Sequence, residues 1–180
     1  LKENNAKATF FVLGHRVDYN SDIIKRMEEE GHEIGNHSYN HKSLDKLSVQ
    51  EIKGQIFDTN NIINNYISKE INLLRPPYGA ISNSGLDIIK ESGISIVLWN
   101  VDPKDWNSKN ADDVGKHIIE YASEGDIILL HDIYKTSVEG AEIAIREMIN
   151  QGYKFVTVSE LLGKYGEVQA GEVYRFANVD

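Results

Sequence analysis

The sequence predicts an α/β fold in which strands and helices alternate and the strands form a parallel sheet. Short apolar runs that favour buried strands alternate, along the 180 residues, with longer segments whose apolar residues recur at helical spacing. Glycine or proline ends most of these segments. Because such an order joins each strand to the next through a crossover helix, the sheet is expected to be parallel and covered by helices.

Six strands are expected from apolar runs of about four to eight residues. They cover residues 8–13, 32–35, 71–74, 94–101, 126–131 and 153–158. Five helices are expected over residues 21–30, 48–67, 85–92, 111–122 and 138–150, and a short sixth starts at Ser159. Ser21 is the expected cap of the first helix, and Ser48 with Glu51 forms a capping-box pattern at the second. Gly31, Gly93 and Gly152 are the expected stops.

The chain is expected to form one domain. Its length suffices for one hydrophobic core, and it contains no internal repeat, low-complexity tract or interdomain linker. We assign residues 1–162 to a catalytic domain and residues 163–180 to a less regular tail of that domain.

Composition excludes several classes of function. The chain has no cysteine, so disulfides, thiolate metal sites and cysteine nucleophiles are excluded. The formal net charge is -9 and no basic cluster is present, which argues against a nucleic-acid partner. No run approaches ~20 apolar residues, so no transmembrane segment is predicted. Histidines and carboxylates remain as the available metal ligands.

His37 and His41 form the most informative pair in the chain. If residues 37–41 begin a helix, both imidazoles lie on one face and can bind one metal ion. Taken alone, the spacing favours two surface histidines on a polar loop, and the polar clusters that follow shift the interpretation towards a metal site.

Three further polar clusters also follow expected strands, where parallel α/β folds gather their chemistry. The cluster Arg75–Gly79 is either a stiff turn or a loop that aims the Tyr78 amide at a ligand oxygen. The cluster Asp102–Trp106 is either a packed turn or the wall of a sugar or acyl pocket. His131, at the end of Leu129–Asp132, is either structural or an acid–base group. We expect all four clusters to converge on one rim.

The ordered set of motifs resembles the polysaccharide deacetylases, the NodB-homology group of carbohydrate esterase family four. The matching segments are His37–His41, Arg75–Gly79, Asp102–Trp106 and Leu129–Asp132, and the run from Ala6 to Gly14 is similar to the family's second strand. The likeness extends to about Leu162.

This resemblance implies a distorted (β/α) barrel and a divalent metal, with zinc as the first choice and cobalt as the alternative. It implies that His37 and His41 are metal ligands, that Arg75 orients the catalytic carboxylate, and that the Tyr78 amide holds the oxyanion. It also implies that His131 is the general acid and is tuned by Asp105, and that Trp106 and Leu129 line the acetyl-methyl pocket.

The chain departs from the family in one motif. The family's Thr-Phe-Asp-Asp-Gly-Pro segment, which supplies the catalytic base and the third metal ligand on a first strand, occurs nowhere in this sequence. We expect a separate N-terminal piece to supply both aspartates and the seventh strand. Without that piece, the edge of the strand at residues 8–13 is expected to pair with a second chain, a swapped segment or the tail. The chain alone is expected to be inactive.

The resemblance implies hydrolytic removal of N-acetyl groups from glycans containing N-acetylglucosamine. Peptidoglycan is the favoured substrate and chitin the second, at the bacterial cell envelope or outside the cell. Three alternatives stay open: a xylan O-acetyl esterase, a cyclic-amide hydrolase, and a catalytically dead glycan-binding remnant. An upstream aspartate pair would favour an enzyme, and its replacement would favour binding alone.

Overall fold

The computed structural model describes residues 1–179, which form two compact units. The sheet unit comprises Thr9–Leu98 and Glu167–Tyr174. The helical unit comprises Leu1–Ala8, Trp99–Gly166 and residues 175–179. Each unit is therefore assembled from segments that are far apart in the sequence.

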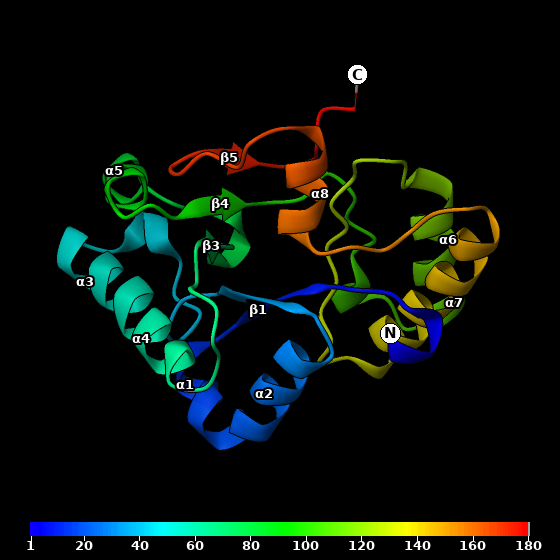
Figure 1. The fold of residues 1–180 in the computed structure, drawn as a ribbon, viewed down its shortest axis with the longest axis horizontal. Helices are drawn as coiled ribbons and strands as arrows, with labels where there is room; N and C mark the ends of the chain where they lie inside the picture. Colours follow the sequence, from blue (N-terminus) through cyan, green and yellow to red (C-terminus); the bar gives the residue numbers. More distant parts are fainter. Residues whose placement is uncertain (180) are drawn as a thin grey trace. The chain divides into compact units, whose positions relative to one another are not determined.

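The sheet unit contains a parallel sheet of five strands in the order β1-β2-β3-β4-β5 (Figure 1). The strands are β1 Thr9–Val12, β2 Glu33–Asn36, β3 Leu73–Leu74, β4 Ser95–Val97 and β5 Val173–Tyr174. Every neighbouring pair is parallel. The predicted α/β class with a parallel sheet is confirmed.

Helices and turns connect these strands and make up most of the helical unit. In the sheet unit they are α1 Gly14–Val17, η2 Asp18–Asn20, α2 Ser21–Glu29, η3 Leu44–Lys46, α3 Val49–Lys53, η4 Gly54–Asp58, α4 Thr59–Asn64, η5 Pro77–Gly79 and α5 Asn83–Glu91. In the helical unit they are η1 Lys2–Asn4, η6 Asp105–Asn107, α6 Ala111–Tyr121, α7 Lys135–Asn150 and α8 Val158–Tyr165. Segment η4 is a π-helical turn, and the other η segments are 3₁₀ turns. No helix among the described residues combines the length and apolar character needed to cross a membrane.

Local signals located most helix ends. The capping box of Ser48 and Glu51 is present at the start of α3, and Gly31 has the left-handed φ of 76° expected after α2. The cap at Ser21 is wrong, because Ser21 is already helical and Asn20 precedes it without a side-chain cap. Helix α7 starts at Lys135, three residues before the expected start at residue 138.

Two expected strands are not formed, and one unexpected strand is. Residues 126–131 make only isolated bridges, Val101 with Ile128 and Asp126 with Phe176. There the Asn100 side chain accepts the Ile127 amide at 2.9 Å, a hydrogen bond that a regular ladder would give to backbone. Residues 153–157 have no regular secondary structure, and Val158 already begins helix α8. The fifth strand, β5, comes instead from the tail and pairs with β4.

Each unit has its own apolar core. In the sheet unit, one buried cluster consists of Val17, Ile24, Ile34, Ile63 and Ile71. In the helical unit, α6 packs along α7 through a cluster that consists of Val101, Val114, Ile118, Ala122, Ala144 and Met148. Gly140 permits this close approach, since a Cβ there would lie 2.6 Å from the Cβ of Val114.

Candidate functional site

The two candidate metal ligands lie in the loop after β2, in the sheet unit. The helix that would place both imidazoles on one face does not form: residues 37–41 are irregular, and Ser38 and His41 have left-handed φ values of 67° and 62°. The loop nevertheless brings the imidazoles together, with ring centroids 4.9 Å apart and planes inclined by 71°. A loop conformation, rather than helical spacing, therefore pairs the histidines.

The ring of His37 is held in one orientation and one tautomer. Its Nδ1 lies 2.6 Å from the backbone carbonyl of Arg75. A carbonyl only accepts hydrogen bonds, so Nδ1 carries the proton and Nε2 carries the lone pair. Metal-binding histidines characteristically donate their second nitrogen in this way, which suits His37 to the role of ligand.

Arg75 is buried directly after β3. Its Nε and Nη2 donate to the carbonyls of Val97 and Leu98 at 3.2 and 3.1 Å, and its guanidinium lies 4.3 Å from the centre of the Phe11 ring. Burial lowers the pKa of Arg75 to about 10, so the group stays cationic at neutral pH. The carbonyls of Val97 and Leu98 and the ring of Phe11 thus hold the Arg75 guanidinium in place as a buried cation. The orientation of a catalytic carboxylate by Arg75 stays a prediction.

The Tyr78 amide is positioned by the tight turn η5. Tyr78 has a left-handed φ of 61°, and the amides of Gly79 and Ala80 donate to Pro76 and Pro77. The Tyr78 amide donates to no acceptor among the described residues, as an oxyanion donor requires. The Tyr78 side chain is 72% exposed, and its ring centroid lies 4.9 Å from that of His41. The sheet unit thus brings His37, His41 and Tyr78 together.

The donor set of the sheet unit fits part of a metal site. Two imidazoles in contact, one of them with a fixed tautomer, are the ligands that zinc or cobalt accepts. Over the described residues, however, no group of three histidines or carboxylates could hold a metal ion. His37 and His41 therefore fit as two ligands of a larger set.

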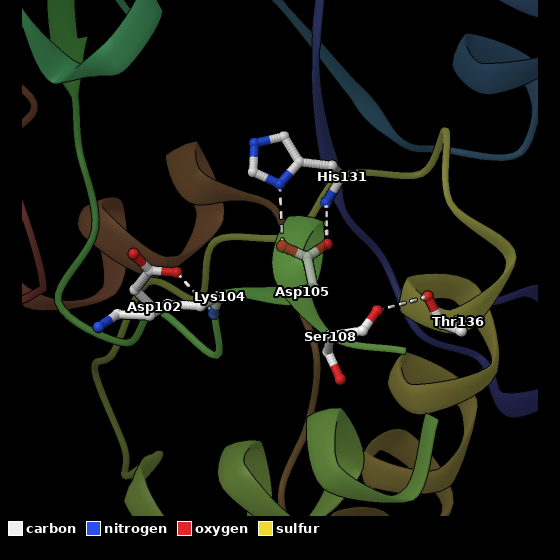
Figure 2. A network of polar contacts seen from close by, with 6 residues as sticks. All are labelled: Asp102, Lys104, Asp105, Ser108, His131 and Thr136. Carbon is white, nitrogen blue, oxygen red and sulfur yellow. Dashed lines mark hydrogen bonds and ion pairs between the residues drawn. The ribbon is translucent and has the colours of Figure 1, made fainter. Parts of the chain in front are cut away.

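The helical unit contains a carboxylate–imidazole pair (Figure 2). Asp105, in η6, is almost fully buried, and its Oδ2 accepts the backbone amide of His131 at 2.7 Å. Its Oδ1 lies 2.9 Å from Nδ1 of His131, whose side chain is 35% exposed. Since the carboxylate accepts at Nδ1, the other ring nitrogen, Nε2, is the one that can exchange a proton with a substrate.

The environment of Asp105 favours its ionised form. Burial raises its pKa, but hydrogen bonds from the His131 ring and amide, together with the nearby Ser137 hydroxyl, outweigh burial and lower the pKa overall. The Ser137 hydroxyl is buried and makes no hydrogen bond of normal geometry within residues 1–179. It lies close enough to Asp105 to lower the pKa of the carboxyl group. The ionised carboxylate of Asp105 therefore lies in direct contact with the His131 ring, where it can stabilise a positive charge.

The remaining predicted residues of the helical unit lie beside this pair in the sequence. Trp106 is in η6 and is 56% exposed, whereas Leu129 is buried at 8% exposure. Asp102 accepts the amide of Lys104 at 2.8 Å and shapes the turn before η6 (Figure 2). An acetyl pocket lined by Trp106 and Leu129 stays a prediction, as does convergence of the two clusters on one rim.

Sequence reasoning missed residues that hold these clusters in place. Asn36 is fully buried at the end of β2, where its Oδ1 accepts the Ser38 amide at 2.7 Å. The sequence did offer one signal for Asn36: a polar residue placed between a predicted strand and the histidine pair could be expected to hold the loop. Gln55 and Ser137 lie in amphipathic helical segments, where no sequence pattern distinguishes them from ordinary surface or core residues.

Comparison with known proteins decides the family. Residues 1–97 match the model of the polysaccharide deacetylases, which is more than half of the chain. The chain belongs to the polysaccharide deacetylase family. The resemblance inferred from the ordered motifs is thereby confirmed.

Relatives within the deacetylase family are named for two amino sugars of peptidoglycan. The peptidoglycan-N-acetylglucosamine deacetylase PgdA of Listeria monocytogenes is 40% identical over 174 residues, which is 97% of this chain and 36% of that protein. The peptidoglycan-N-acetylmuramic acid deacetylase PdaC of Bacillus subtilis is 42% identical over 89% of this chain and 34% of its own length. The chain thus spans about a third of these curated relatives.

Solved structures confirm the fold of this deacetylase family member. The structure of PdaC superposes with a TM-score of 0.83 at 42% identity, covering 89% of this chain and 78% of that chain. An acetyl xylan esterase of family 4 from Clostridium thermocellum, in complex with a cobalt ion, superposes with a TM-score of 0.91 at 32% identity. That alignment covers 99% of this chain and 89% of the esterase.

The lowered pKa of Asp105 predicts a pH-dependent loss of stability. Because its folded-state pKa lies below the ordinary value, ionised Asp105 contributes stability that is present above the ordinary carboxyl pKa. That contribution is lost as the pH falls through the lowered folded-state value. We expect Asp105→Asn to cost roughly 1–3 kcal/mol at pH 7 and progressively less at acidic pH.

Urea unfolding of this deacetylase domain at pH 7 and pH 3 measures the difference. Asp132→Asn, which removes an exposed carboxylate next to His131, is the matched control and should change little at either pH. An Asp105→Asn penalty that is the same at both pH values would mean that ionisation of Asp105 does not contribute to folding.

Proposed function

We propose that this chain contributes metal ligands and a general acid to a hydrolase that removes N-acetyl groups from N-acetylglucosamine units of peptidoglycan. The observation that carries the proposal is the Asp105–His131 pair, a buried carboxylate joined to a partly exposed imidazole. Two relatives named as peptidoglycan deacetylases, at 40% and 42% identity, support the substrate class.

His131 performs the proton transfer in this proposal. Amide hydrolysis fails unless the departing nitrogen is protonated, because an amide anion is a very poor leaving group. Nε2 of His131 donates that proton, and Asp105, hydrogen-bonded at Nδ1, stabilises the imidazolium that holds it. Leu129 and Trp106 border the acetyl methyl group in the same proposal.

The histidine pair, Tyr78 and Arg75 act on the carbonyl end of the amide. His37 and His41 would hold a divalent metal, zinc first and cobalt second, which when bound polarises a carbonyl and lowers the pKa of water. The Tyr78 amide donates to the oxygen that becomes negative as the carbonyl carbon turns tetrahedral. Arg75 orients the catalytic carboxylate through its buried positive charge.

The catalytic base and the third metal ligand are assigned to an aspartate pair outside this sequence. The sequence contains no Asp-Asp-Gly segment, and the histidine pair gathers no carboxylate within the described residues. In this proposal residues 1–162 form one catalytic domain and residues 163–180 form its tail. A separate N-terminal segment completes the domain. The enzyme works at the cell envelope or outside the cell.

Removal of O-acetyl groups from xylan is the second candidate. The superposition on an acetyl xylan esterase with a TM-score of 0.91 favours it, since ester and amide hydrolysis use the same oxyanion and metal chemistry. An alkoxide leaves more readily than an amide anion, so an esterase depends less on His131. Chitin is the second N-acetylated substrate.

Acetate release from matched substrates tests the proposal. The chain is joined to the Asp-Asp segment of a relative, supplied with Zn²⁺, and given peptidoglycan fragments, an N-acetylglucosamine oligomer or acetylated xylan. We expect release from the first two substrates and weaker release from xylan. A clear preference for xylan would establish the esterase, and binding of glycans without any release would establish a glycan-binding remnant.

A further inference from the structure

The loop that pairs the two histidines has a conformation that its residues do not favour. Ser38 and His41 are L residues with side chains, yet both have φ values in the left-handed region, at 67° and 62°. Such conformations persist only where surrounding contacts impose them. The contacts that hold this loop therefore decide whether the imidazoles meet.

The buried side of the loop is held by Asn36. Its Oδ1 accepts the Ser38 amide at 2.7 Å, and its Nδ2 donates to the carbonyl of Ile56 at 2.8 Å and to Oδ1 of Asn60 at 2.6 Å. The Ser38 hydroxyl in turn accepts the His41 amide at 3.0 Å. Asn36 thus ties the first half of the loop to the helix formed by α3, η4 and α4.

The outer side of the loop is held by Gln55. A single acceptor, its Oε1, receives the amides of both Tyr39 and Asn40, at 3.0 and 3.2 Å. These two residues lie midway between the histidines and are exposed. Gln55 thus fixes the two amides in the middle of the loop, while the Tyr39 carbonyl accepts the backbone amide of His15 at 3.1 Å.

Gln55 reaches the loop from the π-helical turn η4, Gly54–Asp58. A π turn inserts one residue into an α-helix and rotates the residues after it, and such turns are frequent at functional sites. Within this turn, the Gln55 side chain accepts the amides of Tyr39 and Asn40. The carbonyl of the next residue, Ile56, accepts the side-chain amide of Asn36. The Thr59 hydroxyl donates to the Gln55 carbonyl at 2.9 Å and secures the turn.

We propose that Gln55, presented by the π-helical turn, is a positioning residue that pre-organises His37 and His41 to bind one metal ion. It touches neither imidazole and acts only through the backbone between them. The proposal rests on the proposed function insofar as it takes these histidines as metal ligands. Beyond the ligands themselves, it assigns to Gln55 and the π-helical turn η4 the role of fixing the relative positions of His37 and His41.

The first measurement tests, without any metal, whether Gln55 holds the amides of Tyr39 and Asn40. We call this pair of hydrogen bonds the clamp. Amide hydrogen exchange of Tyr39 and Asn40 is compared in the unaltered chain, Gln55→Met and Gln55→Glu. Methionine keeps the length of the side chain but has no such acceptor, whereas glutamate keeps the acceptor. We expect Gln55→Met to speed exchange at both amides by about tenfold, in line with the loss of a hydrogen bond, and Gln55→Glu to retain protection. Unchanged exchange in Gln55→Met would overturn the clamp.

The second measurement tests its effect on metal binding. Zn²⁺ titration calorimetry and the visible spectrum of bound Co²⁺ are recorded for the same variants in the active form, joined to the Asp-Asp segment of a relative. We expect Gln55→Met to weaken affinity by roughly 10-fold, the lower end of what outer-shell changes cost, and to alter the Co²⁺ bands, while Gln55→Glu restores both. Gln50→Met, an exposed glutamine on α3, is the matched control.

The outcomes separate this inference from the proposed function. Faster exchange with weaker metal binding in Gln55→Met alone supports the positioning role. Faster exchange with unchanged metal binding overturns it while leaving the histidines as ligands. If the unaltered protein and His37→Ala bind Zn²⁺ equally, the histidines are not the metal ligands. The inference about Gln55 then fails because its premise fails, whatever the exchange rates of Tyr39 and Asn40.

Discussion

Replacing His131 with alanine is expected to reduce deacetylation by about 10²–10⁴-fold, the range that a positioned general acid supplies. The measurement is kcat for acetate release, made on the active form that contains the aspartate pair. In the proposed role, Nε2 of His131 donates the proton to the departing amine while Nδ1 contacts Asp105, so the alanine variant lacks that donor. Zn²⁺ affinity should stay within a few-fold of the unaltered protein.

Two comparisons make this result specific. Substrates whose leaving group needs no proton, such as activated aryl acetates, should be hydrolysed by His131→Ala with a much smaller loss. His117→Ala, on α6, serves as the control for removing a histidine from the helical unit. If His131→Ala instead loses its metal while the fold is retained, His131 is a ligand and the acid role is wrong.

Replacing His37 with alanine is expected to weaken Zn²⁺ binding by more than about 100-fold, beyond what changes to outer-shell groups usually cost. The Nδ1 proton of His37 is committed to the Arg75 carbonyl, which leaves Nε2 as the donor to the metal. Calorimetric titration of the active form, which contains the aspartate pair, measures the affinity. His41→Ala should behave alike, because its ring lies 4.9 Å from that of His37.

His15→Ala separates metal binding from support of the loop. His15 lies outside the pair, and its Nδ1 contacts the Tyr39 carbonyl at 2.7 Å. Its loss removes a loop contact without removing a ligand, so Zn²⁺ affinity should fall far less than in His37→Ala. Equal losses in the two variants would contradict the assignment of His37 as a ligand.

The sequence predicted the parts of the fold that depend on local physics. Apolar runs located β1 to β4 to within a few residues, since burial on a parallel sheet selects such runs. The capping box at Ser48 and the left-handed glycines marked helix ends because those signals are local. The approach of His37 to His41 was also expected, but an irregular loop rather than one turn of helix brings the rings together.

Features that depend on distant partners were not predictable. Strand β5 is only two residues long and exists because Val173 and Tyr174 pair with β4. Residues 126–131 have a strand-like composition, but the Asn100 side chain takes the amide of Ile127. Gln55 became important only because a π turn presents it to Tyr39 and Asn40. None of these contacts leaves a periodic trace in the sequence.

Acetate release from an N-acetylglucosamine oligomer, by the 180-residue chain with Zn²⁺ supplied, tests the central claim most directly. In the proposed mechanism the chain contributes two histidine ligands and a general acid, and the base and third ligand are assigned to an aspartate pair that its sequence lacks. We predict release at the level of buffer for the chain alone, and release that depends on His131 once the Asp-Asp segment of a relative is joined to it. Robust release by the chain alone would show that its own residues suffice and would contradict this division of roles.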